Sequence, residues 1–455
     1  MTDVSEGPQR GDRERPGARR RPARGEPRDA SIAAPDGPPL APEEVAAADD
    51  RRRRRQTVLA VFAAALVGVL VVGFALAAQD EEPPAPKPDI PLDAWAPYWA
   101  LNDSLPELDQ RIASMRDVSP FWFEAVGVGG IRVSENTPTD AAEEFLEIAR
   151  DADADVVPSI VDAMPSGGMA GILADPAQRS AHVEALLAFA DDGDYDGLDL
   201  DYEQFAFADP RSTWEETRPN FVAFVAELAD GLHAEGRTLT VSIPPIYDAG
   251  TTSSSGFWVY DYASIAEHVD RIRIMAYDYS VGDPGPIAPL DFVRRAIDGA
   301  LEATGAPEKL VLGIPAYGRN WPVFVDGECP ESELQGITSI TTRTVDDLIA
   351  RRDATPSFDE STGEAFFEYD LEVTDGQQTC IETRQVHYVD ARGIRMRMDI
   401  ARERQLDGVS LWALGFEDDL VWDAILPTVD GETPSTSATG PDGTEVPAVA
   451  PSSSP

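Results

Sequence analysis

Eight short runs of β-forming residues recur along the middle of this chain, and helical patterns separate several of them. The helical stretches include residues 178–190, 219–236 and 290–305. Alternation of β and α segments predicts a parallel sheet with helices on its outside, and eight strands is the number in a (β/α)8 TIM barrel. We therefore expect an α/β fold of this type. The eight runs are residues 93–101, 120–131, 155–161, 196–203, 238–244, 271–279, 309–317 and 408–415.

An uncharged segment precedes the barrel. Residues 57–78 are 22 consecutive residues without a charge, and as a helix they would extend about 33 Å, enough for a hydrocarbon core of about 30 Å. Five arginines, 51–55, come directly before it, so the positive-inside rule places residues 1–50 in the cytoplasm and the barrel outside the cell membrane. Residues 75–77 (ALA) could instead end a cleaved signal peptide. The length of the apolar segment and of its leader favours a single-pass transmembrane helix.

The remaining segments flank the barrel. Residues 1–56 have the composition of a disordered cytoplasmic tail, and residues 79–92 form a Pro-rich linker. We assign the barrel to residues 93–428. Residues 429–455 are a Ser/Pro-rich tail that cannot form a core.

A long gap, from about 324 to 392, lies between the seventh and eighth runs. It includes a strand-like stretch, "EAFFEYD", at 364–370, and we expect a small α+β insertion before strand 8. The gap also holds Cys329 and Cys380, the two cysteines of the chain. In an exported domain a disulfide between them is plausible, and two free thiols are the alternative.

Composition excludes several classes of function. The formal net charge of −45 argues against binding to nucleic acid, because phosphate contacts need clustered Lys and Arg. Neither cysteine lies in a metal-ligand spacing, and the four histidines include no H-E-x-x-H motif. We therefore expect no metal and no cofactor. We also expect the chain to be a monomer.

One stretch, "DDGDYDGLDLDYEQF" at 191–205, is unusually acidic. It fits the calcium-loop pattern D-x-[DN]-x-[DN]-G-x₅-E with Glu203 as its last residue. Three observations oppose a calcium site: Asp199 occupies a position that is normally apolar, Pro210 interrupts the expected exiting helix, and no second loop exists.

The same stretch also alternates with the period of a strand. From residue 198 to 203, three apolar residues alternate with Asp199, Asp201 and Glu203, so the three acids share one face. In a barrel that face points to the axis, where mutual repulsion raises the pKa of at least one acid toward the range of a general acid. A solvated acidic strand is the alternative interpretation.

The run "DGLDLDYE" resembles the D-G-x-D-x-D-x-E signature of family 18 glycoside hydrolases, which are chitinase-like (β/α)8 barrels. "MAYD" (275–278) is similar to the family's motif on strand six, and "SLWALG" places Trp412 where the family has a tryptophan under the sugar. "APYW" places Tyr98 on the first strand, and "PFWF" places Phe121 on an aromatic second strand. The resemblance covers roughly residues 93–428.

The resemblance implies a retaining, substrate-assisted mechanism. Glu203 would protonate the glycosidic oxygen, and the 2-acetamido group of the sugar would be the nucleophile. Asp201 would orient that group, Asp199 would modulate Asp201, and Tyr277 would donate a hydrogen bond to the acetamido oxygen. The resemblance implies four substrate-binding residues besides Asp278: Tyr98, Phe121, Met275 and Trp412.

One departure bears on the substrate. Where the family usually has S-x-G-G on strand three, this chain reads "PSIVDAMPSGGM" (158–169), so the subsite is shaped differently. With "GIPAYGRNW" (313–321), the chain looks closer to bacterial cell-envelope relatives, the spore-cortex N-acetylglucosaminidases. The implied substrate is a β-linked N-acetylhexosamine polymer, either peptidoglycan or chitin-like. A catalytically silent carbohydrate-binding barrel and an envelope scaffold are the alternatives.

Overall fold

The computed structural model describes residues 88–248, 255–329, 336–374 and 378–426, which all belong to one compact unit. All eight predicted strands are present, and the second and third are each divided in two. The barrel strands are β1 (Leu92–Pro97), β2 (Asp117–Phe121), β3 (Phe123–Ala125), β5 (Asp155–Val156), β6 (Ser159–Asp162), β7 (Gly197–Asp201), β8 (Thr238–Ile243), β9 (Arg271–Ile274), β10 (Leu310–Pro315) and β16 (Gly408–Trp412).

Parallel pairings join these strands in a closed ring. β1 pairs with β2 on one side and with β16 on the other, and β10, β9, β8, β7 and β6 follow β16 in order. The ring closes because β2 pairs with β5, and β3 with β6. Pro158, which lacks an N–H, lies in the break between β5 and β6. These pairings confirm the predicted barrel.

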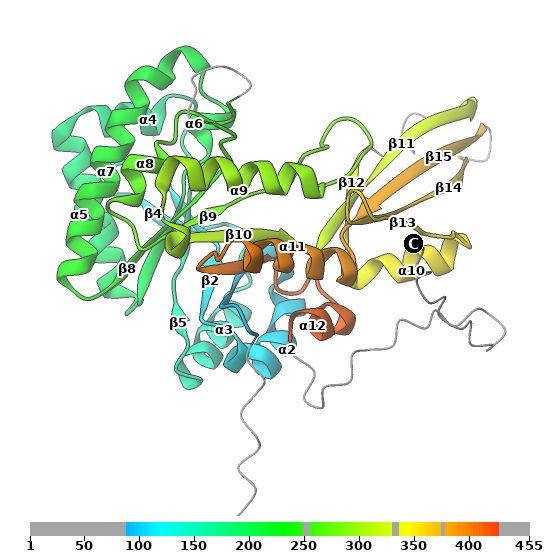
Figure 1. Ribbon diagram of the computed structural model, residues 1–455, viewed down its shortest axis with the longest axis horizontal. Helices are drawn as coiled ribbons and strands as arrows, with labels where there is room; N and C mark the ends of the chain where they lie inside the picture. The colour runs from blue at the N-terminus through cyan, green and yellow to red at the C-terminus, as the bar shows by residue number, and fades with distance from the viewer. Residues whose placement is uncertain (1–87, 249–254, 330–335, 375–377, 427–455) are drawn as a thin grey trace, which may run out of the picture. The chain divides into compact units, whose positions relative to one another are not determined.

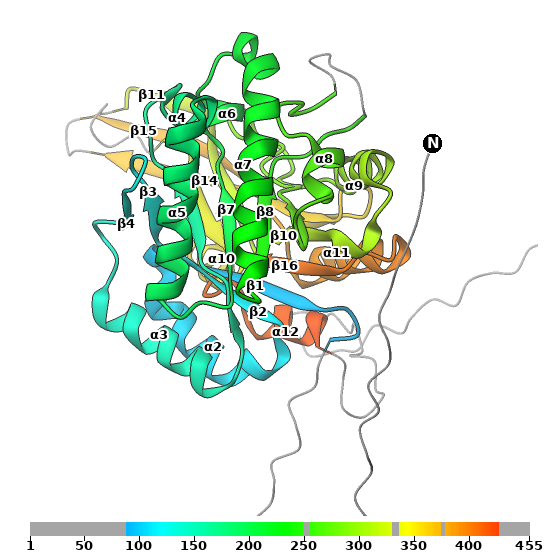
Figure 2. The same ribbon diagram turned by 90° about the vertical axis from the view of Figure 1, so that its left-hand side faces the viewer.

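Helices connect successive barrel strands. Figure 2 shows α5 and α7 side by side in front of β7 and β8, and both helices contact each other. The longer helices are α2 (Leu101–Arg111), α3 (Thr139–Asp151), α4 (Gly168–Ala174), α5 (Pro176–Asp192), α7 (Trp214–Ala234), α9 (Leu290–Thr304), α11 (Ala391–Glu403) and α12 (Asp419–Ile425). The shorter elements are α6 (Gln204–Phe207), α8 (Tyr262–Ala266) and β4 (Ile131–Val133), which forms a hairpin with β3.

Apolar and acidic residues alternate along β7, and the apolar residues pack it into the main hydrophobic core. Leu198 and Leu200 have no exposed surface and belong to the main hydrophobic core. Burial of each side chain stabilises the fold by roughly 2 kcal/mol. Their neighbours Asp199 and Asp201 point the other way and are almost as fully buried, so both faces of this strand are covered.

Several strand bounds differ from the prediction, and two of these differences bear on the site. The second strand begins at Asp117 and not at Pro120, and the sixth ends at Ile274, before the motif residue Met275. Asp117 is charged, and a charged residue does not look like part of a buried strand. It is accommodated because Arg271 and Arg273 pair with it inside the barrel.

The insertion begins earlier than predicted, at Tyr317 and not near 324, because β11 follows β10 after a single residue. It is a five-stranded antiparallel sheet in the order β12-β11-β15-β14-β13 (Figure 1), with its own small hydrophobic core against the helix α10. Its elements are β11 (Tyr317–Gly327), β12 (Thr338–Thr341), α10 (Thr342–Arg352), β13 (Ser357–Asp359), β14 (Glu364–Thr374) and β15 (Thr379–Tyr388).

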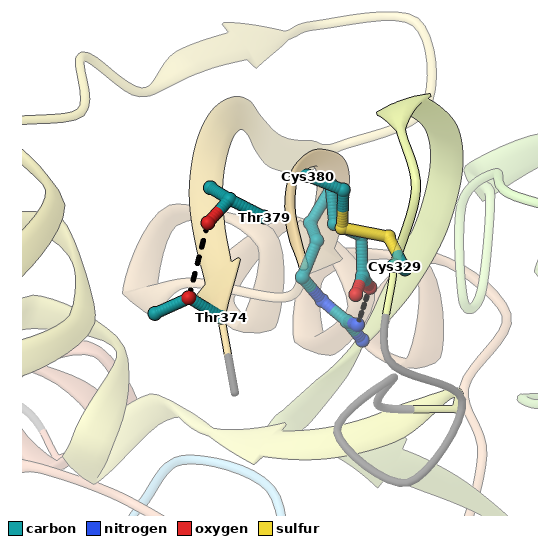
Figure 3. The surroundings of a disulfide bond; sticks show 6 residues. Cys329, Thr374, Thr379 and Cys380 are labelled. Atoms are coloured by element: carbon teal, nitrogen blue, oxygen red, sulfur yellow. Dashed lines mark hydrogen bonds and ion pairs between the residues drawn. A yellow bond between two sulfur atoms is a disulfide. The ribbon is translucent and has the colours of Figure 1, made fainter. Parts of the chain in front are cut away.

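The two cysteines form a disulfide within this insertion (Figure 3). Cys329 follows the end of β11 and Cys380 lies at the start of β15, with their Cα atoms 4.9 Å apart. Beside it, Thr379 donates a hydrogen bond to Thr374 across the β14–β15 pair (Figure 3). The disulfide therefore joins the ends of β11 and β15, two paired strands of the insertion sheet.

Several predicted segments lie outside the described residues. These are the N-terminal tail (1–56), the transmembrane helix (57–78), most of the linker (79–92) and the whole C-terminal tail (429–455), together with 427–428 of the predicted barrel range. Within the described ranges, no helix combines the length and apolar character that crossing a membrane requires.

Candidate active site

The strand β7 positions a row of three carboxylates. Asp199 and Asp201 lie on its inner face, and Glu203 follows its end, directly before the short helix α6. The strand starts at Gly197, where a Cβ atom would lie 2.5 Å from the backbone oxygen of Thr238 on β8. Glycine is thus needed for the close approach of β7 and β8 at the start of the strand that carries the row.

Asp199 is the deepest of the three and is fully buried. Its Oδ2 accepts hydrogen bonds from the indole of Trp95 (3.0 Å), the hydroxyl of Ser159 (2.6 Å) and the guanidinium of Arg273 (3.1 Å). Its Oδ1 accepts one from Ser242 (2.7 Å). Four donors from four different strands therefore surround this carboxylate.

Asp201 lies one layer above and has a different environment. Its side chain is buried, and its Oδ1 has no hydrogen-bond partner within the described part of the chain. Burial raises the pKa of Asp201 well above its ordinary value, and the charges of Glu203 and Asp199 raise it further. This group is held where a proton or a substrate donor would satisfy it.

Glu203 has the pKa that a general acid needs. Burial raises its pKa to about 7, and the negative charge of Asp278 contributes to the increase. A carboxylic acid with this pKa is still substantially protonated near neutral pH, and it can donate that proton to a leaving group.

The segment after β9 carries three predicted site residues, Met275, Tyr277 and Asp278. Asp278 has a left-handed backbone conformation, with φ of 57°. It accepts hydrogen bonds from the hydroxyl of Tyr317 and from the guanidinium of Arg319 (2.7 Å), both on β11. The first strand of the insertion therefore completes this side of the site.

These groups face a cleft of about 720 Å³ whose walls are mostly aromatic. Trp412, at the end of β16, is one of these aromatic residues: its ring is 4.9 Å from that of Phe121 and 6.4 Å from that of Tyr277, centroid to centroid. The cleft is lined by Trp99, Phe121, Asp201, Glu203, Phe207, Pro244, Pro245, Tyr247, Phe257, Met275, Tyr277, Asp278, Tyr279, Val281, Phe292, Tyr317 and Trp412.

Two predicted site residues do not line this cleft. Tyr98 is partly buried against the main core, and its neighbour Trp99, which is 53% exposed, takes its place on the wall. Both follow β1 in a short 3₁₀ turn, Tyr98–Ala100, where strand alternation no longer decides which side chain points inward. Asp199 lies beneath the cleft, under Asp201.

Sequence reasoning missed Trp99, Tyr317, Arg319 and Arg273. Tyr317 and Arg319 lie two residues apart on one face of β11, a spacing visible in "AYGRN". Arg273 lies two residues before Met275, at the inward spacing of β9. That spacing was a usable signal, but a buried arginine is rare enough that it is not expected there.

The residues of the calcium-loop pattern have other roles in the structure. Oδ2 of Asp196 accepts a hydrogen bond from the backbone N–H of Val156 (2.8 Å), which joins it to the third strand. The segment then continues into β7 and not into the exiting helix of an EF-hand. Across the described ranges, no group of three His, Cys, Asp or Glu side chains is placed to hold a metal ion.

A comparison with protein families matches the family described as "Glycosyl hydrolases family 18" over residues 53–417. Among curated proteins, the putative sporulation-specific glycosylase YdhD of Bacillus subtilis is 28% identical over 247 residues (53% of this chain, 52% of that protein). The cortical fragment-lytic enzyme of the same organism is 27% identical over 226 residues (48% and 49%). The chain thus spans about half the length of these two relatives.

Solved structures share the fold. A chitinase from Chromobacterium violaceum superposes with a TM-score of 0.59 at 25% identity, covering 74% of this chain and 98% of that one. The spore cortex-lytic enzyme SleL of Bacillus megaterium superposes with a TM-score of 0.60 at 19% identity, covering 75% of each chain.

Proposed function

This chain belongs to family 18 of the glycosyl hydrolases, and we propose that it cleaves β-linked N-acetylglucosamine-containing polymers by a retaining, substrate-assisted mechanism. The membership agrees with the resemblance drawn from "DGLDLDYE". The observation that carries the proposal is the position of Glu203, a carboxylic acid with a pKa of about 7, in an aromatic cleft directly above Asp201.

In the proposed first step, Glu203 donates its proton to the glycosidic oxygen, and the bond from that oxygen to the anomeric carbon breaks. The carbonyl oxygen of the 2-acetamido group of the same sugar attacks the anomeric carbon and forms an oxazolinium ion. Asp201 accepts a hydrogen bond from the acetamido N–H, which supplies a partner to its Oδ1, an atom with none among the described residues. Tyr277 donates to the acetamido oxygen.

In the second step, the Glu203 carboxylate removes a proton from water, and the water oxygen attacks the anomeric carbon from the face that the leaving group occupied. The oxazolinium ring opens, and the anomeric configuration is retained. Trp412 supports the apolar face of the sugar, because aromatic faces stack well against the C–H groups of pyranose rings.

The substrate polymer is either peptidoglycan or chitin-like. Relatives named as a cortical fragment-lytic enzyme and as a chitinase support both possibilities. The assay therefore presents the full chain in detergent with chitooligosaccharides and with purified peptidoglycan, and NMR identifies the anomer that is released first.

We expect wild type to release β-anomeric products from at least one substrate, and Glu203→Gln to be roughly 10²–10⁴-fold slower. Glu216→Gln, an exposed acid at the start of α7, is the matched control and retains full activity. If wild type binds these glycans without cleaving them, the chain is a carbohydrate-binding barrel and the proposal fails. Cleavage that survives in Glu203→Gln removes the role assigned to the acid.

We also propose that residues 57–78 anchor the chain in the cell membrane with the barrel outside. The support is the length of this uncharged segment and the five arginines that precede it. Fractionation of expressing cells tests it: the full chain is expected in the membrane pellet after alkaline extraction. Recovery of the chain in the extracted supernatant would overturn the anchor.

A further inference from the structure

A buried arginine lies at the centre of the barrel, below the catalytic row. Arg273 on β9 is fully buried, and its guanidinium is shared among carboxylates from three strands. It pairs with Asp117 of β2, lies 3.1 Å from Asp199 of β7, and lies 3.6 Å from Asp93 of β1. It also donates to the hydroxyl of Ser119 (2.6 Å). A charge removed from water to this extent persists only when ion pairs and hydrogen bonds offset its desolvation.

The three carboxylates do not depend on Arg273 equally. Asp93 accepts two hydrogen bonds from Arg116, both of 2.7 Å. Asp117 has a second cation in Arg271, at 3.3 Å. In the part of the chain that the structure describes, the only cation paired with Asp199 is Arg273.

Asp199 and Asp201 therefore have contrasting hydrogen-bond and ion-pair environments, although they lie two positions apart on the same face of β7. Asp199 accepts from one cation and three neutral donors, the set that favours an ionised carboxylate. Asp201 has no cation partner among the described residues, and its Oδ1 lacks any hydrogen bond there. The row is thus divided into one anion held in place and one group free to exchange a proton.

We infer that Arg273 is a positioning residue of the active site, which holds Asp199 as a permanent carboxylate beneath Asp201 and so confines the exchangeable proton of the row to Asp201 and Glu203. This inference rests on the proposed function, because it assigns the proton that the first step uses. It also separates Arg273 from its neighbour Arg271, which contacts Asp117 and Asp407 and does not touch Asp199.

Other charges in and below the barrel act on the same proton. The pKa of Asp117 is raised to about 7, by burial and then by Asp93, so this neighbour gains a proton at mildly acid pH and leaves Arg273 to Asp93 and Asp199. The titratable and charged groups around the row include Asp93, Arg116, Asp117, Asp155, Asp201, Glu203, Tyr260, Arg271, Arg273, Tyr277, Asp278 and Asp407.

Removal of Arg273 is expected to shift the pH dependence of activity in one direction. Loss of a positive charge near the pair of acids makes each of their protons harder to remove, so the first ionisation of the Asp201–Glu203 pair moves to higher pH. In Arg273→Gln, the acid limb of kcat/KM is expected to rise by roughly one pH unit. Arg271→Gln removes the same charge from the same strand and is expected to leave that limb within about 0.3 unit of wild type.

Two further variants keep the test informative if Arg273→Gln does not fold. Arg273→Lys keeps the charge and is expected to restore the acid limb. The double variant Arg273→Gln/Asp117→Asn removes the cation together with one of its anions, so less uncompensated charge remains buried while Asp199 still loses its cation. An acid limb that stays in place in both Arg273→Gln and Arg273→Gln/Asp117→Asn would overturn the inference.

A direct titration keeps the test independent of activity. Carbon-13 NMR of aspartate carboxyl groups in the full chain, with the signal of Asp199 assigned through Asp199→Asn, follows each proton from about pH 4 to about pH 9. The Asp199 signal of Arg273→Gln is expected to move toward that of a protonated acid relative to wild type, because the variant lacks the cation paired with this carboxylate. Identical Asp199 signals in the two proteins would sink the inference. If wild type cleaves no glycan, the proposed function fails, and this titration still decides the role of Arg273.

Discussion

At the scale of single residues, the chemistry of the site depends on the groups that surround each carboxylate of the row on β7. Asp199, Asp201 and Glu203 have the same functional group, but their surroundings give them different tasks. Asp199 has four donors, Asp201 has an oxygen without a partner in the described part of the chain, and Glu203 is buried beside Asp278. An acid of raised pKa next to a group that can accept a substrate N–H is what substrate-assisted cleavage needs.

Asp278 gives a prediction about pH dependence. Its negative charge contributes to the raised pKa of Glu203, so Asp278→Asn is expected to lower that pKa. Because the general acid must be protonated, activity is lost as pH rises through this pKa, near 7 in wild type. The alkaline limb of kcat/KM for a chitooligosaccharide should therefore move down by roughly 0.5–1 unit in the variant.

A control separates charge from geometry in this experiment. Asp278 also accepts hydrogen bonds from Tyr317 and Arg319, so Tyr317→Phe disturbs the same contacts and leaves the charge of Asp278 in place. Tyr317→Phe is expected to reduce kcat/KM without moving the limb. An alkaline limb that stays fixed in Asp278→Asn would show that burial alone raises the pKa of Glu203.

At the scale of the elements, the site is assembled where strands of the barrel end and where the insertion begins. β7 supplies the acids, the segment after β9 supplies Tyr277 and Asp278, and β16 supplies Trp412. β11 belongs to the insertion sheet but pairs its first residues with the barrel site through Tyr317 and Arg319. The insertion is therefore part of the candidate active site and not only an addition on the rim.

The close approach of β7 and β8 gives a prediction about stability. A Cβ at Gly197 would lie 2.3 Å from the hydroxyl and 2.5 Å from the backbone oxygen of Thr238, so Gly197→Ala must move one strand. We expect a loss of roughly 1–3 kcal/mol in the free energy of unfolding, measured by denaturant titration.

Gly171 provides the matched control for that variant. It lies within the helix α4, and a Cβ there would meet nothing within 4 Å. Gly171→Ala is expected to be neutral or to stabilise the protein by up to about 1 kcal/mol, since alanine is the better helix former. Equal stability of Gly197→Ala and wild type would contradict the close approach of these strands.

At the scale of the whole molecule, the acidic charge affects which polymers can approach. The formal net charge is −45, and among the described residues the ionisable side chains that line the cleft are acids and tyrosines, without Lys or Arg. An anionic polymer such as peptidoglycan is repelled by such a surface, whereas an uncharged chitooligosaccharide is not.

Salt should therefore distinguish the two substrates. The screening length shortens from about 10 Å at 0.1 M to about 3 Å at 1 M, so the KM for soluble peptidoglycan fragments is expected to fall several-fold over that range. The KM for chitooligosaccharides should stay within about twofold, which makes it the internal control. Identical salt dependence of the two substrates would show that surface charge does not govern access.

Much of the site follows from local patterns in the sequence. The alternation from Leu198 to Glu203 has the period of a strand, and this period alone places the acids on one face and the leucines on the other. The succession of β and α segments similarly predicts the barrel, because each such unit must cover its sheet in the same way.

Only the tertiary structure decided which distant groups meet these acids. The indole of Trp95 reaches Asp199 from 104 positions away, and Arg273 reaches it from 74. Closure of the barrel brings them together, and no local period encodes it. The same holds for the choice of Trp99 over Tyr98 on the cleft wall, which depends on a turn. Periodicity determines which face a side chain occupies, whereas the pKa of that side chain depends on charges that packing brings near it.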